Sequence, residues 1–455
     1  MRSGSSTRAF ALWATTLIGA GCSAEDAAVG QAPLARAEAL EDIARAEGLL
    51  FAIHPEPARH VSHAVLEAAF EDVRRNLPAE LTRAELYQRL APVLARVADG
   101  HTGLRPPGPR SPPLALVAHR GALYLAADLP GAPAGSRVEE LLHHPGPAWV
   151  ARCLALASGA GEARKEQALG SVLAFLVDEA RDSEDGGLPL TLTLPDGTRR
   201  RLPAVSPPAS SPRLPARVAA LPGGAVYLAL RTMTGTDHEV EAFFVSLFRW
   251  LDATEASGVV VDLRNNRGGS TYVGDLLLSH LSDRPYRLFG QKRWRVSREM
   301  QAYLREQWSG TAFEGYLRAE PGTDFVEVPE VVARPSLGPR FQGPAVLLIG
   351  RDTLSAAMMT ANAAEDFGLA MLVGEPTSSS PNYFGEVYRT ELRHSGLTLE
   401  ISSAEFVRAN GNHADAAPVR PTRHVRSPPG RPPGPSDDAV RVALDGLRAL
   451  ASREP

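Results

Sequence analysis

Lysine and cysteine are both scarce in this sequence of 455 residues. Only Lys165 and Lys292 occur among the 48 basic residues, so any mechanism that needs a lysine has just two candidates. Only Cys22 and Cys153 occur, which excludes a disulfide framework and leaves folding to hydrophobic cores. The net charge of −4 excludes a general affinity for nucleic acid, and 44% hydrophobic with 22% charged residues is typical of a globular protein.

A long apolar run is also missing near the N-terminus, where residues 9–21 fall short of the roughly 20 residues that span a bilayer as a helix. Two arginines precede this run and small residues end it, which is the pattern of an export signal. The stretch from Gly19 to Cys22 resembles a bacterial lipoprotein cleavage box, in which the cysteine is lipidated, although leucine is usual at the position of Gly19. We expect residues 1–22 to be a signal peptide and the exported chain to be anchored by lipid at Cys22 in the bacterial cell envelope. A plain secretory signal cut nearby is the alternative.

The chain divides at proline-rich linkers. Apolar residues recur at helical spacing before the first linker, so residues 23–108 are predicted to form a helical domain. The linkers, at 105–113 and 206–217, bracket a mixed segment, residues 112–205, whose end carries a hairpin signal around an Asp-Gly pair. A proline-rich spacer and a short helix are predicted for residues 427–455.

Residues 213–426 alternate between strand and helix patterns. Apolar stretches such as "GVVVDLR" and "AVLLIG" are unbroken, which predicts a parallel sheet covered by helices on both faces and hence an α/β fold. In sheets of this kind ligands bind at the carboxyl ends of strands. Ser355 lies just past one such end and residues 265–269 lie just past another.

Two hydroxyl side chains, Thr353 and Ser355, follow the strand "AVLLIG" at the start of a predicted helix. Either could simply cap that helix, but a helix N-terminus also offers free N–H groups and a partial positive charge to a nucleophile. The N–H of Ser355 or Ala356 could then face an oxyanion. The paired glycines Gly268 and Gly269 would let backbone N–H groups approach a ligand, although Asn-Arg-Gly-Gly is also an ordinary loop.

Two polar segments add titratable side chains. His101 lies in the turn "ADGHTGL" after a helical stretch, where an exposed histidine without a role is the alternative to a catalyst. Asp415 lies near a Val-x-Pro turn in "GNHADAAPVRP", where it could be an Asx-turn residue. Asp262 and Arg264 are predicted to anchor the loop that follows their strand rather than to react.

Three blocks in the last third of the chain resemble the C-terminal processing (tail-specific) serine peptidases. These blocks are "VVVDLRNNRGG", "VLLIGRDTLSAAMMTANA" and "LVGEPTSSS", in the order and structural context of that family. The resemblance covers about residues 213–425 and implies a crotonase-like (ClpP/crotonase) core of stacked βα layers with Ser355 as the nucleophile. It also implies an oxyanion hole made by backbone N–H groups of Gly268 or Gly269 and of Ala356.

The family activates its serine in two ways. One branch uses a lysine in the turn that here reads "TSSSPNYFGE", so a dyad would need one of the two lysines to reach in from elsewhere. The other branch resembles the tricorn core, and it implies His101 as general base with Asp415 as its acidic partner. Gly100 stands where the tricorn type has a relaying serine. Asp415 would therefore contact His101 directly or through Thr102, Asp99 or a water.

The resemblance also bears on the remaining segments. Many relatives carry a PDZ domain in the place of residues 112–205, so we expect a degenerate PDZ-like domain that could bind a chain end as an added strand. A family-specific insertion that acts as a spacer is the alternative. No cofactor and no metal are implied, and the histidine pairs His60/His63 and His143/His144 lack the partner set of a zinc site.

The predicted function is that of an exported serine peptidase that cuts peptides or unfolded proteins through an acyl-enzyme. The main alternative is a catalytically inactive crotonase-fold protein that binds peptides or hydrophobic ligands. A crotonase-type acyl-CoA enzyme is a third reading, against which stand the nucleophilic serine and the export signal. Convergence of Ser355, His101 and the glycine N–H groups would favour the peptidase over the binding protein.

Overall fold

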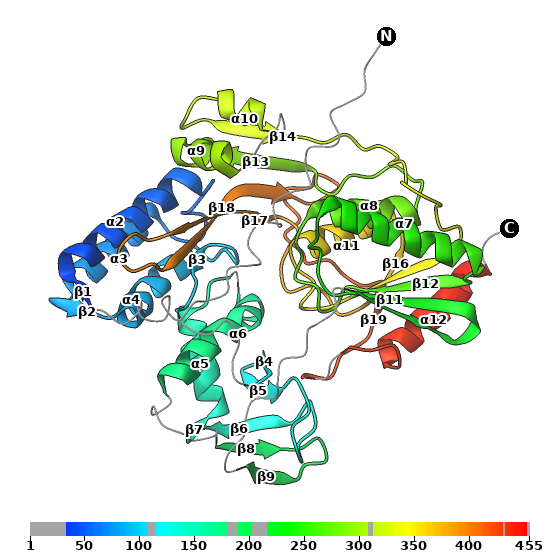
Figure 1. Ribbon diagram of the computed structural model, residues 1–455, viewed down its shortest axis with the longest axis horizontal. Helices are drawn as coiled ribbons and strands as arrows, with labels where there is room; N and C mark the ends of the chain where they lie inside the picture. Colours follow the sequence, from blue (N-terminus) through cyan, green and yellow to red (C-terminus); the bar gives the residue numbers. More distant parts are fainter. Residues whose placement is uncertain are drawn as a thin grey trace.

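The computed structural model of the chain describes residues 33–107, 114–159, 161–180, 189–202, 216–307, 313–430 and 433–452 (Figure 1). The predicted signal peptide, with Cys22, lies outside these ranges, and so do most residues of the two internal linkers. Within the described ranges, no helix has both the length and the apolar character needed to cross a membrane.

Three helices form the N-terminal part of the described chain and pack beside strand β18 (Figure 1). The third helix begins with a capping box in which Thr82 and Glu85 satisfy each other's backbone N–H groups. Buried Asp42 accepts the backbone N–H groups of His394 and Ser395, at 3.1 and 2.7 Å, which ties the first helix to the turn before β18. The elements are β1 (Leu34–Ala35), α2 (Arg36–Ile53), α3 (His63–Arg75), β2 (Glu80–Leu81) and α4 (Arg83–Ala95).

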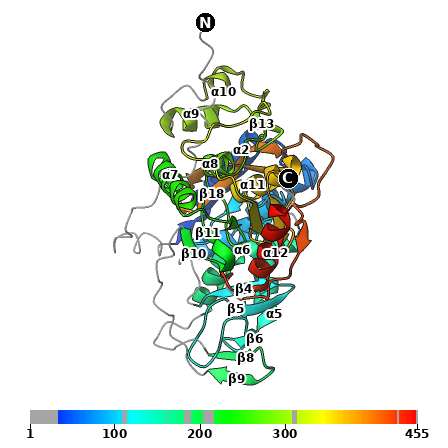
Figure 2. The same ribbon diagram turned by 90° about the vertical axis from the view of Figure 1, so that its right-hand side faces the viewer.

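The segment between the two linkers forms an antiparallel sheet of its own with two helices packed against it, at the end of the molecule opposite α10 in both views (Figures 1 and 2). The predicted hairpin is present, since the last two strands are antiparallel neighbours in which Leu190 lies opposite Leu202 and Thr193 lies opposite Arg199. The strand order is β4-β5-β6-β8-β9, with β7 on the side of β6. The elements are β4 (Leu116–His119), β5 (Ala122–Leu125), β6 (Arg137–Leu141), β7 (His144–Pro145), α5 (Gly146–Leu156), α6 (Glu162–Glu179), β8 (Leu190–Thr193) and β9 (Arg199–Leu202).

The core sheet has the order β10-β11-β12-β15-β16-β19, and every pair except β10–β11 is parallel, as the unbroken apolar strands predict. Side chains of one face, such as Val260 and Leu348, pack against α12, and those of the other face, such as Val261 and Leu347, belong to the larger core. Figure 2 shows α7 and α12 on opposite sides of this sheet. The predicted C-terminal helix therefore covers the second face of the core. The elements are β10 (Ala216–Ala220), a 3₁₀ turn (Pro222–Gly224), β11 (Ala225–Leu230), α7 (Asp237–Ala253), β12 (Gly258–Asp262), α8 (Thr271–Leu281), β15 (Ala345–Ile349), α11 (Ala356–Phe367), β16 (Met371–Gly374), β19 (Arg423–His424) and α12 (Asp438–Ala451).

A second antiparallel sheet, of order β14-β13-β18-β17, links the core to the N-terminal helices, and the sequence patterns do not predict it. The short strand β3, which follows the turn of His101, pairs with β18 through Leu104–Leu399 and Gly103–Glu400. This pairing brings His101 next to strands from the C-terminal half of the chain. The elements are β3 (Gly103–Leu104), β13 (Gln291–Arg295), α9 (Arg298–Gln307), α10 (Glu314–Arg318), β14 (Asp324–Glu327), β17 (Tyr383–Glu391) and β18 (Thr398–Val407).

A buried ion pair fixes the end of β12. Arg264 donates to both carboxylate oxygens of Asp262, at 3.0 and 2.7 Å, and also contacts Asp437, the cap of α12, at 2.8 Å. The hydroxyl of Tyr227 donates to Asp262 at 2.6 Å. Burial alone would raise the pKa of Asp262, but Arg264 and Tyr227 hold that pKa below its usual value. The two charged residues thus anchor the loop after β12, as predicted.

We expect Asp262→Ala to lower the free energy of unfolding by about 3–5 kcal/mol, because it removes a partner from a buried guanidinium. Urea unfolding followed by circular dichroism measures this at pH 7. Asp445→Ala is the control, since it breaks the exposed pair with Arg448 and should cost less than about 1 kcal/mol.

The pH dependence of the difference is a further check. The pKa of Asp262 is lowered in the folded state, so its contribution is present above its unfolded pKa of about 3.9 and is lost as the pH falls through the lower folded value. A stability difference between wild type and Asp262→Ala that stays constant down to pH 2, or one no larger than that of the control, would contradict the assignment.

Candidate active site

Ser355 lies in the turn between β15 and α11 with φ 50° and ψ −127°. Non-glycine residues rarely adopt this backbone conformation, so the turn is strained. Thr353 anchors the turn, since its hydroxyl accepts the N–H of Gly350 at 3.0 Å and donates to the carbonyl of Leu263 at 2.8 Å. The half-buried Ser355 side chain makes no capping hydrogen bond to α11. Thr353 therefore has a structural role, whereas the capping role considered for Ser355 is wrong.

The glycine pair of the β12 loop packs against this turn. A Cβ atom on Gly268, whose φ is 94°, would lie 2.7 Å from Ser355 Cβ and 2.8 Å from the backbone nitrogen of Ala356. A Cβ atom on Gly269, whose φ is 141°, would lie 2.3 Å from the carbonyl oxygen of Met233. Both positions therefore require glycine, and the first brings the loop directly onto the serine turn.

The N–H groups of this loop differ in what they bind. Gly268 N–H donates to the side-chain oxygen of Asn266 at 2.8 Å. Among the described residues, the N–H groups of Gly269 and Ala356 donate to no protein acceptor. The oxyanion-hole assignment of Gly268, Gly269 and Ala356 stays a prediction, and the hydrogen bonding favours Gly269 over Gly268 within it.

His101 lies in the turn between α4 and β3, with 21% of its side chain exposed. Its backbone N–H donates to Asp99 Oδ1 at 3.1 Å, and its ring Nδ1 lies 3.9 Å from the same oxygen. Asp99 Oδ2 accepts the hydroxyls of Thr102, at 2.6 Å, and of Ser402 on β18. Burial alone would raise the pKa of Asp99, but the neighbouring His54 and His101 contribute to lowering it to about 2. A buried, ionised carboxylate therefore lies beside His101.

Asp415 has other partners. Its carboxylate pairs with Arg408, which also binds Asp366 at 2.8 Å, and it accepts the N–H of Ala417 at 3.0 Å as an Asx-turn residue does. The pairing of Asp415 with His101 stays a prediction. The carboxylate that the structure places against His101 is that of Asp99, which the sequence analysis considered only as a bridge.

Tyr383, at the start of β17, connects the serine and the histidine. Its ring lies 5.7 Å from that of His101, and its hydroxyl donates to Met359 Sδ at 3.1 Å, one turn into the helix after Ser355. Burial raises the pKa of the Tyr383 phenol, and the neighbouring Ser355 hydroxyl opposes that rise. Tyr383 therefore contacts His101 from the N-terminal part of the chain and Met359 from the helix that follows Ser355. No feature of the segment "PNYFGE" indicates this position in the sequence.

Comparison with known proteins identifies the family of this core. Residues 224–425 match the model of peptidase family S41. The core of the chain, residues 224–425, therefore belongs to peptidase family S41. The resemblance to C-terminal processing peptidases is thereby confirmed, and the chain is a serine-type peptidase.

Solved structures share the fold over most of this S41 peptidase. Mature CPAF covers 86% of this chain and 92% of its own length at a TM-score of 0.59 and 16% identity. The photosystem II D1 C-terminal processing protease covers 91% of this chain and 98% of its own at a TM-score of 0.50 and 17% identity. No curated protein sequence matches.

Lys292 does not take the place of the lysine that the other S41 branch uses to activate its serine. Its ammonium group is buried, pairs with Glu386 and lies 4.2 Å from the centre of the Trp294 ring. Within the described ranges, no cluster of three or more histidine, cysteine, aspartate or glutamate side chains could hold a metal ion.

The segment between the two linkers contacts the serine turn. Arg351, four positions before Ser355, pairs with Glu166 of α6 at 2.8 Å and with His119 of β4. Glu166 also accepts the N–H of Gly121 at 2.7 Å. The PDZ-like nature of this segment stays a prediction, but these contacts place the segment next to the serine turn.

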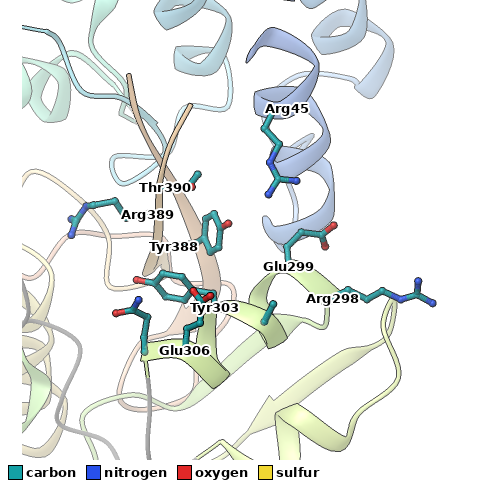
Figure 3. Close-up of a pocket in the computed structure, with 10 residues that line it drawn as sticks. Arg45, Arg298, Glu299, Tyr303, Glu306, Tyr388, Arg389 and Thr390 are labelled. Atoms are coloured by element: carbon teal, nitrogen blue, oxygen red, sulfur yellow. The ribbon is translucent and has the colours of Figure 1, made fainter. Parts of the chain in front are cut away.

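A separate hollow lies further along β17, between α2 and α9 (Figure 3). The rings of Tyr303 and Tyr388 lie 4.9 Å apart in it, and Arg45 points toward it from α2. None of the predicted site residues lines this hollow. It is therefore distinct from the serine turn.

We expect Gly268→Ala to slow the reaction of Ser355 with a fluorophosphonate by on the order of 10²-fold, because the new methyl group would displace the serine turn. The rate of fluorescent labelling measures this effect. Gly170→Ala in α6 is the matched control, since a Cβ there meets nothing within 4 Å. Wild-type labelling rates in Gly268→Ala would show that the loop does not position the serine.

Proposed function

We propose that this S41 peptidase hydrolyses peptide bonds through an acyl-enzyme on Ser355, with His101 as general base. The observation that carries the proposal is the position of Tyr383, whose ring lies 5.7 Å from that of His101 and whose hydroxyl binds Met359, one helical turn after Ser355. Family membership and the extended fold likeness support a crotonase-like core for residues 213–426. Peptides or unfolded proteins are the substrates that this chemistry implies.

The reaction begins with proton transfer from Ser355 to His101. Neutral imidazole takes the Oγ proton while Oγ attacks the carbonyl carbon of the substrate, because a serine hydroxyl is a poor nucleophile near neutral pH. The imidazolium then gives this proton to the leaving nitrogen, and the C–N bond breaks. A water repeats the sequence on the acyl-enzyme, with His101 taking its proton and returning it to Ser355.

The negative charge on the substrate oxygen needs hydrogen-bond donors that are already in place. The N–H groups of Ala356 and Gly269 suit this role, since no described protein group accepts from them. Gly268 would contribute by its lack of a side chain, which lets the loop lie against Ser355. The strained turn at Ser355 would present Oγ to both the base and the substrate.

A carboxylate beside the base stabilises the imidazolium formed during attack. Asp99 fits this role better than Asp415, because Asp99 is buried and ionised next to His101 whereas Asp415 pairs with Arg408. The 3.9 Å between His101 Nδ1 and Asp99 Oδ1 would shorten when the ring gains its proton. We therefore assign the acidic role to Asp99 in this proposal.

We expect a fluorophosphonate probe to label Ser355 and to leave Ser355→Ala unlabelled, as judged by peptide mass spectrometry. His101→Ala should lower turnover of a peptide by on the order of 10² to 10⁴-fold, the usual contribution of a general base. Turnover should rise with pH as the imidazole loses its proton, since only the neutral ring accepts one.

The control for this experiment is His60→Ala, which changes an exposed histidine outside the site. Folding of each variant is checked by circular dichroism. Absence of label on the folded wild-type protein would favour the binding protein over the peptidase, and wild-type turnover in His101→Ala would exclude the histidine mechanism.

We propose export and lipid anchoring through Cys22, on the strength of the charged, apolar and small-residue pattern of residues 1–22. Mass spectrometry of the protein isolated from a bacterial membrane fraction should find a diacylated Cys22 as the mature N-terminus. Two acyl chains give stable attachment, whereas one chain gives only marginal binding. Cys22→Ser should release the protein from the membrane, and a mature N-terminus elsewhere would refute the anchor.

A further inference from the structure

His54, at the C-terminal end of α2, is fully buried and lies behind the proposed active site. Its Nδ1 accepts the backbone N–H of Glu56 at 3.0 Å, and its ring packs 4.5 Å from that of Phe384. A ring nitrogen that accepts a hydrogen bond carries no proton. The neutral ring must therefore hold its proton on Nε2.

The Nε2–H group of His54 faces Asp99. Nε2 lies 3.5 Å from Asp99 Oδ2 and completes no hydrogen bond with any described residue, so Asp99 is the acceptor that it faces. Buried N–H groups are almost always paired, so Asp99 is the partner that this donor requires. The contact crosses from α2 to the turn that carries His101.

The two oxygens of Asp99 have separate roles. Oδ1 faces His101, through the backbone N–H at 3.1 Å and the ring at 3.9 Å. Oδ2 accepts the hydroxyls of Thr102 and Ser402 and faces His54. One oxygen is thus held by two hydroxyl donors, with the Nε2–H of His54 3.5 Å away, while the other stays directed at the proposed base.

We infer that His54 is a positioning residue that fixes the Asp99 carboxylate for His101 without cancelling its charge. This inference rests on the proposed function, because it gives His101 the role of the base. A lysine or arginine in the place of His54 would also anchor Oδ2, but its positive charge would weaken the stabilisation of an imidazolium by Asp99. A neutral imidazole supplies the hydrogen bond and leaves the negative charge available.

A double-mutant cycle with Asp99 tests the inference. We expect His54→Leu to lower kcat on a peptide by on the order of 10-fold with little change in KM, since the side chain acts only through Asp99. In the Asp99→Asn background the same change should lower kcat by less than about 2-fold, because the anchored charge is already absent. His60→Leu, at an exposed position on the same segment, is the control.

A conservative variant separates the hydrogen bond from packing. His54→Gln places an amide N–H at the same number of bonds from the backbone and should recover most of the lost turnover. Equal losses in the two backgrounds, or no recovery with glutamine, would overturn the inference. Labelling of Ser355 in the same preparations shows whether the proposed function itself holds.

Where His54→Leu does not fold, the wild-type protein still gives a test. Nitrogen chemical shifts of ¹⁵N-labelled histidine at pH 8, assigned by comparison with His54→Gln, report which ring nitrogen carries the proton. A proton on Nε2 supports the inference, and a proton on Nδ1 overturns it. This measurement does not depend on activity.

Discussion

The buried carboxylate of Asp99 is the constraint on which the site depends. An ionised group without water must be surrounded by donors, and those that Asp99 uses come from distant parts of the chain. Thr102 and the His101 backbone lie beside it in sequence, His54 comes from α2, and Ser402 comes from β18. Satisfying this one group therefore fixes the N-terminal helices on the second sheet and orients the histidine turn.

The serine turn is held in a different way from Asp99. Here the strained backbone of Ser355 is stabilised by the residues packed around it. A residue with φ 50° is costly, and the cost is met by the hydrogen bonds of Thr353 and by the close approach of the Gly268 loop. Both lie at the carboxyl ends of parallel strands, β15 and β12, that pair directly. The turn of Ser355 and the loop of Gly268 are thus both held by the parallel core sheet.

Local patterns predict the parts of this protein that follow from local rules. The unbroken apolar strands and the helix after Ser355 predict the parallel core because burial on both faces leaves a clear signature in sequence. The second sheet has no such signature, since β13 ("QKRWR") and β14 ("DFVE") contain few apolar residues and β13 pairs with β18, far along the chain. Its existence depends on tertiary pairing rather than on propensity.

The candidate site was predictable to the same extent. The sequence identifies Ser355 and His101 as candidates because the junction and the turn that hold them also match the motifs of C-terminal processing peptidases. It does not reveal that Arg408 engages Asp415, since that pair forms only where β18 ends and Arg408 turns inward. His54 and Tyr383 carry no local signal, because a lone buried histidine or tyrosine usually belongs to the core.

A crystal structure of the fluorophosphonate adduct tests directly whether Ser355 and His101 work together with an oxyanion hole at Ala356 and Gly269. We expect phosphorus bonded to Ser355 Oγ, with one phosphonyl oxygen about 2.7–3.1 Å from the backbone nitrogens of Ala356 and Gly269. His101 should lie within hydrogen-bond reach of the adduct with Asp99 behind it. An adduct whose oxygen faces solvent, or a His101 ring turned away from Ser355, would contradict this expectation.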